Sequence, residues 1–281
     1  MTLSGVIAAV PTPLKDGAPD PERFHRHAAW ALENGCDGLN VLGSTGEATS
    51  FSPQARKGLM RAAAASLPTG RLMVGTGAPD LETAIALTDL AGRLGFAGAL
   101  VLPPYYYSNV DDAGLFAFFD ALIRATEVPI YLYNFPQMTG LAFSPALVRR
   151  LKDAHPDRLR GAKDSSGDLT YAAELAGIAD FDVFPSDETA WADTRYAGII
   201  SATANLTAPL AATVRAAPEG AERLGALRKA IAAQPLVPAV KHLVARRLGD
   251  DAFAEVLPPF RPLTAAERAA LEPVAAELET L

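Results

Sequence analysis

The sequence predicts a (β/α)8 barrel followed by a small C-terminal helical region, and three observations support this prediction. Eight short apolar runs alternate with stretches of helical periodicity up to residue 201. Each run is almost continuously apolar, which is typical of strands buried on both faces of a parallel sheet. The chain has 281 residues, and one barrel of about 250 residues fits within that length. An open, doubly wound sheet is disfavoured because no G-x-G-x-x-G turn follows Val10.

The predicted strands and helices follow one another regularly. The strands are rich in Val, Ile and Leu, and each is followed by Gly, Pro, Ser or Asn. They span residues 5–10, 38–42, 72–75, 98–102, 129–133, 159–162, 181–184 and 198–201. Asp20, Ser52 and Ser144 each precede a proline, a combination that favours the start of a helix. Asp80 is expected to cap a further helix over 81–94.

The last part of the chain is expected to be helical. Three helices are predicted at 219–233, 236–248 and 264–278, with a kink at Pro273 because proline removes a backbone hydrogen bond. No strand pattern follows Thr213. We therefore divide the chain into a barrel of residues 1–215, which carries the active site, and a helical appendage of residues 216–281.

Composition narrows the functional classes. The chain carries 25 Lys and Arg against 32 Asp and Glu, a net charge of −7, which disfavours binding to nucleic acid or an anionic membrane. The single cysteine, Cys36, excludes an intramolecular disulfide. Residues 1–10 lack the basic and apolar regions of a signal peptide, and no apolar run reaches the length of a membrane span. These features predict a cytoplasmic protein.

Lys163 stands out among the residues at the strand ends, where such a barrel forms its active site. It is the only one of six lysines that directly follows a predicted strand. Desolvation inside a barrel disfavours the ammonium form, and a neutral amine can attack a carbonyl to form a Schiff base. An ion pair with Asp164 or another carboxylate is the alternative, and position alone leaves both interpretations open.

Two neighbouring features suit the same chemistry. Tyr133 ends the preceding strand, and its phenol is able to relay protons during carbon–carbon cleavage, although most such tyrosines only line a core. The loop 43–47 lacks the Walker spacing, but its two glycines flank Ser44 and Thr45 in a form that suits a small carboxylate. An ordinary tight turn is the simpler interpretation of this loop.

Metal and hydrolase chemistry are poorly supported. No H-E-x-x-H or G-x-S-x-G motif occurs, and the four histidines fall in predicted helices away from the strand ends. They are His25, His27, His155 and His242. His25 and His27 are two residues apart, so we expect them on a solvated face.

Four motifs resemble, in order and spacing, those of the dihydrodipicolinate synthase/N-acetylneuraminate lyase family, along essentially the whole chain. They are GSTGE at 43–47, PYY at 104–106, YNFP at 133–136 and GAKD at 161–164. The resemblance implies a class I pyruvate aldolase on a (β/α)8 barrel, with Lys163 as the Schiff-base residue. It further implies that Tyr133, Ser44 and a tyrosine from a neighbouring subunit relay protons, and that Thr45 binds the pyruvyl carboxylate.

The same resemblance implies a homotetramer made of two dimers, and no metal or organic cofactor. The donated tyrosine maps to Tyr106, and the adjacent Tyr107 is the alternative.

Matched positions within the family favour a sugar acid as substrate. Met138 stands where dihydrodipicolinate synthases carry an arginine for the carboxylate of aspartate semialdehyde, and methionine cannot form that bidentate contact. Sugar-acid lyases bind substrate hydroxyls at positions that Asp187, Glu188 and Ser201 resemble, and Ser44 in place of threonine is also lyase-like. Further substrate contacts are expected from two residues at the same strand ends, Ser165 and Ile200.

The sequence thus predicts a Schiff-base aldolase that reversibly cleaves a 2-keto-3-deoxy sugar acid to pyruvate and an aldehyde. A sugar-acid dehydratase and a dihydrodipicolinate synthase, which use the same lysine imine, are the enzymatic alternatives. A non-catalytic keto-acid sensor is an alternative of another class. The joint presence of Lys163, Tyr133 and Ser44 disfavours it, because binding alone needs no proton relay.

Overall fold

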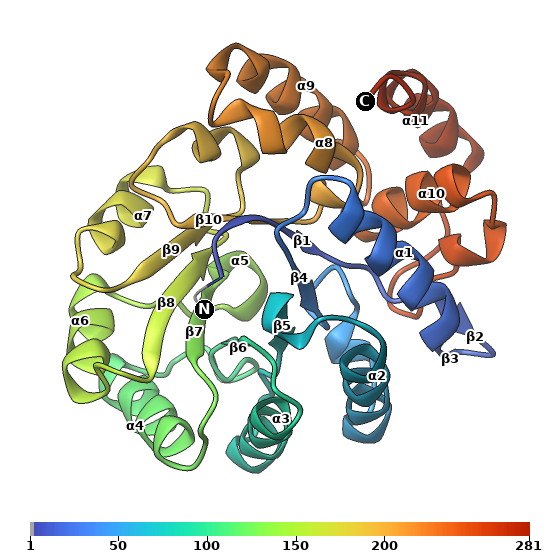
Figure 1. Ribbon diagram of the computed structural model, residues 1–281. Coiled ribbons are helices and arrows are strands. Elements are labelled where there is room, and N and C mark those ends of the chain that lie inside the picture. The colour runs from blue at the N-terminus through green and yellow to red at the C-terminus, as the bar shows by residue number, and fades with distance from the viewer. Residues whose placement is uncertain (1–2) are drawn as a thin grey trace.

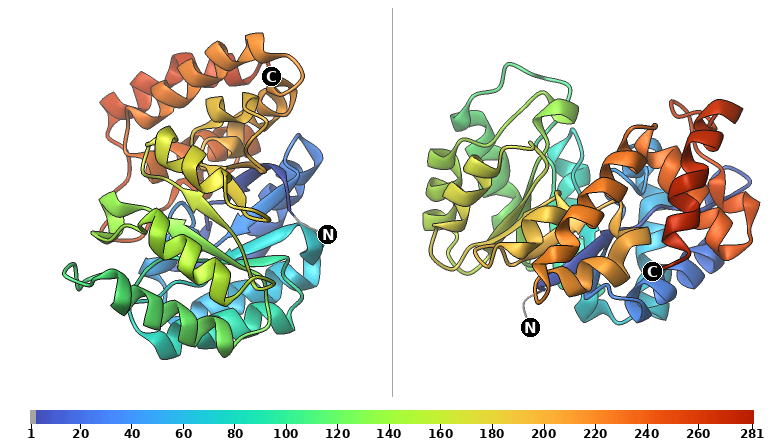
Figure 2. Two further views of the ribbon diagram at one scale, coloured as in Figure 1. Left: turned by 90° about the vertical axis from the view of Figure 1, so that its left-hand side faces the viewer. Right: turned by 90° about the horizontal axis from the view of Figure 1, so that it is seen from above.

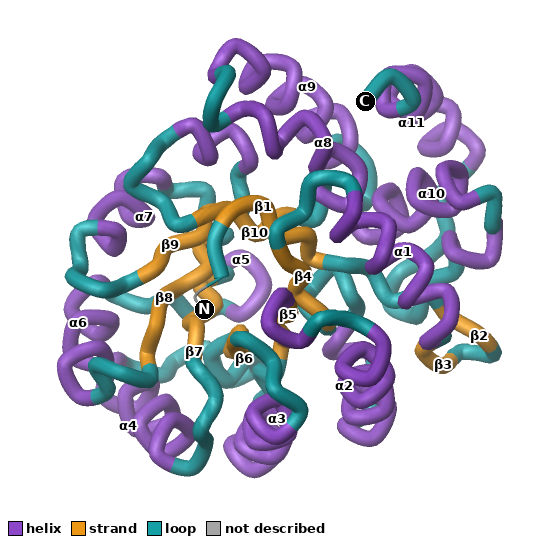
Figure 3. The backbone as a smooth tube through the Cα atoms, viewed as in Figure 1, coloured by secondary structure: helices purple, strands orange, loops and turns teal. Residues whose placement is uncertain are grey.

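Eight parallel strands form a nearly closed barrel that helices surround (Figures 1 and 3). The structure, a computed structural model, describes residues 3–281, so the first two residues of the expected barrel domain lie outside the described residues. The strand order is β10-β1-β4-β5-β6-β7-β8-β9. The two ends of this order meet where Ala197 N–H donates to Val183 O at 3.1 Å. The predicted (β/α)8 barrel is confirmed.

The eight barrel strands agree with the eight predicted apolar runs. They are β1 (Gly5–Ala9), β4 (Gly38–Val41), β5 (Leu72–Gly75), β6 (Gly98–Val101), β7 (Ile130–Asn134), β8 (Leu159–Asp164), β9 (Asp182–Pro185) and β10 (Gly198–Ser201). The largest difference is at β8, which continues two residues beyond the predicted end and so includes Lys163.

Helices follow the strands around the outside of the barrel. They are α1 (Pro21–Glu33), α2 (Pro53–Ser66), α3 (Leu81–Arg93), α4 (Asp112–Arg124), α6 (Pro145–Ala154), α7 (Leu169–Ala176) and α8 (Ala204–Val214). The predicted caps are confirmed, since the side chains of Asp20, Ser52, Asp80 and Ser144 all accept backbone N–H groups. Several short elements were not predicted: the hairpin β2 (Leu14–Lys15) and β3 (Ala18–Pro19), α5 (Pro136–Thr139), and 3-10 turns at Ala48–Ser50, Thr69–Arg71, Glu188–Ala192 and Asp251–Ala254. A 3-10 turn at Pro218–Gly220 occupies the start of the helix predicted at 219–233.

Three further helices complete the chain: α9 (Ala221–Ala232), α10 (Leu236–Leu248) and α11 (Ala265–Leu278). They pack together beside α8 and share a core that includes Leu206 of α8 (Figure 1). Helix α11 continues through Pro273. The division at residue 215 falls just after α8 and remains an interpretation of the sequence.

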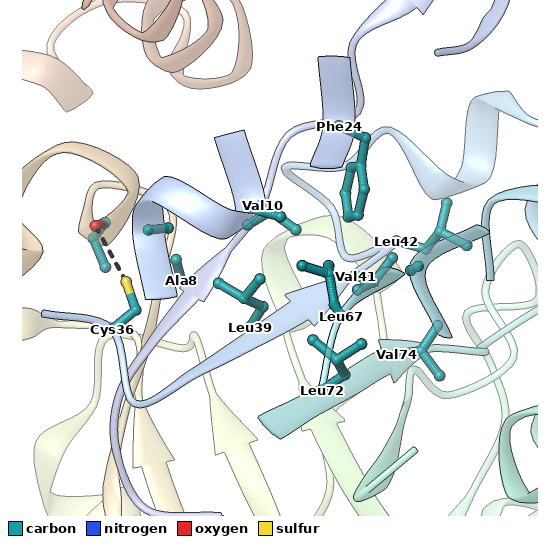
Figure 4. Close-up of a cluster of buried hydrophobic side chains, with 14 of the residues drawn as sticks. Ala8, Val10, Phe24, Cys36, Leu39, Val41, Leu42, Leu67, Leu72 and Val74 are labelled. Carbon is teal, nitrogen blue, oxygen red and sulfur yellow. Dashed lines mark hydrogen bonds between the residues drawn. The ribbon is translucent and has the colours of Figure 1, made fainter. Parts of the chain in front are cut away.

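Side chains of the strands alternate between the barrel interior and the layer beneath the helices. Residues such as Leu39, Val41, Leu72 and Val74 pack outward, in the same apolar layer as Phe24 of α1 (Figure 4). The interior holds a separate cluster, whose members include Ile7, Ala9, Met73, Leu100, Tyr131, Tyr133, Phe184 and Ile200. Because successive residues point to opposite faces, the odd-numbered residues of β7 face the interior.

No helix within residues 3–281 is both long enough and apolar enough to cross a membrane.

Candidate active site

Lys163 lies on the interior face of β8 and is only 4% exposed. The parallel register places it beside Tyr133 of β7. Asp164 points away from it, and its carboxylate accepts hydrogen bonds from Asn134 Nδ2 at 2.7 Å and Ser166 Oγ at 2.8 Å. Burial raises the pKa of Asp164, and these donors oppose the rise. The alternative interpretation of Lys163, an ion pair with Asp164, is therefore wrong.

Three side chains from three elements form a continuous hydrogen-bonded chain. Lys163 Nζ donates to Tyr133 Oη at 3.2 Å, and Tyr133 Oη lies 3.3 Å from Ser44 Oγ. Lys163 Nζ also lies 4.3 Å from the centroid of the Tyr133 ring. A phenol between an amine and an aliphatic hydroxyl is placed to pass a proton in either direction. The structure thus brings together three of the four predicted catalytic residues.

The loop that carries Ser44 and Thr45 is held from several sides. Thr12 Oγ1 donates to Gly46 O at 2.8 Å, and Glu47 N–H closes the turn onto Ser44 O at 3.1 Å. Thr45 is buried, with 5% exposed. These contacts give Ser44 a defined position opposite Tyr133.

Arg56 was not expected at this site. It extends from α2 to line the same small cavity as Ser44 and Tyr133. Its guanidinium donates to Gly75 O and Gly77 O at 3.0–3.2 Å, and burial lowers its pKa to about 10. The sequence held one signal for it, because Arg56 lies three residues before Leu59, on the same face as the buried stripe of α2.

The predicted hydroxyl-binding residues separate into two groups. Asp187 is partly exposed, and Arg228 of α9 reaches toward it with Nε 3.8 Å from Asp187 Oδ1. Arg228 Nη1 also donates to Ser201 Oγ at 3.3 Å. Arg228 was not predicted, because it lies in a region that we assigned to the appendage. It gives the Asp187–Ser201 pair a cationic neighbour.

Glu188 is placed differently from the expectation. It is fully buried, and its two carboxylate oxygens accept from Thr207 Oγ1 and Thr203 Oγ1, both at 2.8 Å. Burial raises the pKa of Glu188. In this conformation the structure does not support a direct contact between Glu188 and substrate hydroxyls.

The other expected contacts follow the strand ends. Ile200 is buried in the barrel interior with Tyr133. Ser165 directly follows β8, and its N–H donates to Asn134 O at 2.8 Å. These two residues remain predicted substrate contacts.

Tyr106 lies apart from these residues. Its side chain is 85% exposed and its φ is +97°, a conformation that L-residues rarely adopt. Tyr107 is 67% exposed, and the two rings meet edge to face at 5.3 Å. The loop between β6 and α4 that carries both residues projects from the barrel (Figure 2). Within one chain, Tyr106 is not packed against its own relay.

The histidines do not form a metal site. Among residues 3–281 no three His, Cys, Asp or Glu side chains come together in a way that suits a metal ion. The prediction of a solvated face holds for His25, which is exposed, but is wrong for His27, which is completely buried. His27 belongs to the inward-facing stripe of α1 that includes Phe24, Ala28 and Ala31.

The dihydrodipicolinate synthetase family model matches residues 2–278. The chain belongs to this family. Proteins of the dihydrodipicolinate synthetase family are lyases and synthases of the class I aldolase type, which accords with the predicted carbon–carbon lyase. A 4-hydroxy-tetrahydrodipicolinate synthase of Hydrogenobaculum is 32% identical over 66% of this chain and 64% of the relative. The matched region thus spans slightly less than two thirds of that relative's length.

Solved structures of other proteins agree with the fold over nearly the whole chain. A dihydrodipicolinate synthase from Agrobacterium tumefaciens has a TM-score of 0.90 at 31% identity, with 98% of this chain and 99% of that chain covered. A KD(P)GA from T. tenax has a TM-score of 0.88 at 26% identity, with the same coverage of both chains. The solved structures that resemble this chain thus include proteins named dihydrodipicolinate synthase and KD(P)GA.

Proposed function

We propose that this protein is a Schiff-base aldolase that reversibly cleaves a 2-keto-3-deoxy sugar acid to pyruvate and an aldehyde. The observation that carries the proposal is the buried chain from Lys163 through Tyr133 to Ser44. An amine that lacks a carboxylate partner at Asp164 is free to react with a carbonyl, and the phenol beside it is placed to move protons.

The reaction uses these groups in a fixed order. The Lys163 amine attacks C2 of the keto acid, and Tyr133 gives its phenolic proton to the departing carbinolamine oxygen, so that water leaves and a protonated imine remains as the electron acceptor. Tyr133, which has given up its proton, then takes the proton of the C4 hydroxyl while the C3–C4 bond breaks, which releases the aldehyde and leaves an enamine. Protonation of the enamine at C3 and hydrolysis of the imine then release pyruvate and restore the amine. Ser44 connects the phenol to the loop, and Thr45 binds the carboxylate.

The choice of a sugar acid rests on two places at the rim of the site. Asp187 and Arg228 offer hydrogen-bonding groups for substrate hydroxyls, and the buried Ser201 accepts a hydrogen bond from Arg228. Met138 is 70% exposed and replaces the arginine that would bind the carboxylate of aspartate semialdehyde. Dehydration of a keto-deoxy sugar acid through the same imine is the second candidate reaction. A third candidate reaction, dihydrodipicolinate synthesis, is supported by the name of the Hydrogenobaculum relative.

Borohydride trapping tests the covalent step. Incubation with pyruvate and borohydride should inactivate the protein and add one reduced pyruvyl group, and peptide mapping should place that group on Lys163. Lys241 and Lys152 are buried as well and serve as internal controls. A label on either of them, or no label, would contradict the proposal.

A substrate panel tests the choice of aldehyde. Pyruvate release should be measured with keto-deoxy acids of different length and configuration, together with condensation of pyruvate and aspartate semialdehyde. A lost charge-assisted bidentate contact is worth about 2–4 kcal/mol, so the condensation should be roughly 30- to 1,000-fold slower than in an arginine-bearing synthase. Met138→Arg should recover part of that difference. Complementation of a strain that lacks dihydrodipicolinate synthase by the unaltered protein would contradict the choice of a sugar acid.

A further inference from the structure

A buried ion pair joins the C-terminal helices to the loop that carries Ser44 and Thr45. Lys241 of α10 lies 2.6 Å from Glu47, measured from Nζ to Oε1, and neither side chain is accessible to solvent. Burial lowers the pKa of Lys241, and the Glu47 carboxylate opposes this. The catalytic steps derived above use neither residue.

The remaining polar atoms of the pair extend the connection. Lys241 Nζ also donates to Thr12 O at 2.8 Å, and Glu47 Oε2 accepts from Leu257 N–H at 2.8 Å. Thr12 in turn donates through Oγ1 to Gly46 O. The pair therefore ties together the segment after β1, the loop after β4, helix α10 and the segment before α11.

The backbone of the loop requires such support. Leu42 and Glu47, at the two ends of the turn, have φ values of +55° and +54°. Non-glycine residues adopt this left-handed conformation only where the surrounding structure holds them there. Between them stand Ser44, which meets Tyr133, and Thr45.

We infer that Lys241 is a positioning residue, which acts through Glu47 to hold Ser44 against Tyr133 and to fix the adjacent Thr45. Helix α10 is then part of the framework of the active site. This inference rests on the proposed Lys163 imine and deepens it. Stability alone does not call for such a pair, because a buried ion pair is often no more stabilising than apolar residues of similar volume. A directional contact, in contrast, fixes the position of the loop.

The test separates positioning from stability. Lys241→Met alone leaves the Glu47 charge buried without a partner and should lower the melting temperature strongly. The double variant Lys241→Met/Glu47→Met removes both charges and should regain most of that loss. Glu47→Gln keeps the volume but has one acceptor oxygen in place of two, so it cannot serve both Lys241 and Leu257 N–H and should also lower the melting temperature. Arg247→Met is the matched control, since Arg247 also joins α10 to the barrel but contacts His27 and Asn205 instead of the loop.

Two measurements report on the loop. Exchange of the pyruvate methyl protons with D2O, followed by NMR, requires the Lys163 enamine and its proton relay but no second substrate. The double variant and Glu47→Gln should still trap pyruvate on Lys163 with borohydride, yet exchange the methyl protons about 10- to 100-fold more slowly. Amide hydrogen exchange of residues 43–51 should become faster in both variants. Arg247→Met should lower the melting temperature with methyl exchange and residues 43–51 unchanged.

The outcomes distinguish this inference from the proposed function. Methyl exchange within about twofold of the unaltered protein, with unchanged amide exchange over 43–51 in a folded variant, would overturn the positioning role. Absence of imine trapping in the unaltered protein would contradict the proposed function. In that case amide exchange over residues 43–51 still decides whether Lys241 holds the loop.

Discussion

Two tyrosines of β7 have the same orientation but different surroundings. Tyr133 lies between Lys163 and Ser44, whereas Tyr131, two residues earlier, lies deeper in the barrel with its hydroxyl 3.5 Å from Asp182 Oδ2. Burial, followed by the Asp182 charge, raises the pKa of Tyr131. Only the Tyr133 hydroxyl is therefore connected to the groups that exchange protons.

This difference gives a matched pair of substitutions. Tyr133→Phe should lower kcat for pyruvate release by about 100-fold or more, because general acid–base catalysis contributes roughly 10²- to 10⁴-fold. Tyr131→Phe removes the same atom from the same strand and should change kcat only a few-fold. Steady-state kinetics on both variants, with circular dichroism as a check of folding, provide the measurement. Equal losses in the two variants would assign Tyr133 a packing role.

The strand pattern placed Lys163, Tyr133 and Ser44 at one mouth, because each stands at or just after the end of an apolar run in a barrel. Their catalytic roles were assigned from the family resemblance, since position alone left other interpretations open. Arg228 follows no strand and reaches Ser201 from a helix 27 residues further along the chain. The sequence also could not show that both carboxylate oxygens of Glu188 accept hydrogen bonds within the protein. Its donors, Thr203 and Thr207, belong to the start of another helix. Positions set by the strand pattern were predictable, and contacts made across elements were not.

At the scale of elements, His27 joins three helices. Arg247 of α10 donates to His27 Nδ1 at 2.9 Å, so the proton of the neutral ring is on Nε2, 2.8 Å from Asn205 Oδ1 of α8. The Arg247 guanidinium also stacks on Trp30 of α1, 3.4 Å from the ring centroid. A second proton on His27 would lie buried beside a cation. Burial first, and then the Arg247 charge, lower the pKa of His27 to about 3.

This arrangement predicts a loss of stability in acid. The unfolded chain binds a proton at His27 near the ordinary pKa of 6.5, and the folded chain does so only near 3. The free energy of unfolding should therefore fall as pH drops below about 6.5, by up to about 1.4 kcal/mol per pH unit for one proton. Urea unfolding at pH 7 and pH 5 measures the difference. His27→Gln should reduce it by about 2 kcal/mol.

The exposed His25 on the same helix provides the control. His25→Gln should leave the pH dependence of the unfolding free energy unchanged. If both variants behave like the unaltered protein, His27 does not govern acid stability.

The burial of His27 had a signal in the sequence, because the residue follows Phe24 by three positions on the apolar stripe of α1. Its partner Arg247, 220 residues away, had none.

At the scale of the whole molecule, the exposed side chain of Tyr106 bears on how subunits assemble. This large aromatic side chain, on a projecting loop with positive φ, meets Tyr107 edge to face but is still 85% exposed. We propose that a second subunit receives it, within the homotetramer that the family resemblance implies. In a closed two-fold dimer, each subunit contributes to its partner the same residue that the partner contributes to it. The relay of each active site would then be completed by the neighbouring subunit.

Mixing two inactive variants tests this exchange. Tyr106→Phe should lower kcat by about 10²- to 10³-fold with little change in fold, as expected for a lost relay hydroxyl, whereas Tyr107→Phe should change it only a few-fold. Lys163→Ala should be inactive. A hybrid dimer of Tyr106→Phe and Lys163→Ala subunits contains one site with an intact lysine and an intact donated tyrosine. Random reassociation of equal amounts makes half of the dimers hybrid, so about a quarter of the original activity should return. Hybrids detected by native mass spectrometry without recovered activity would show that Tyr106 acts within its own subunit or only packs at the interface.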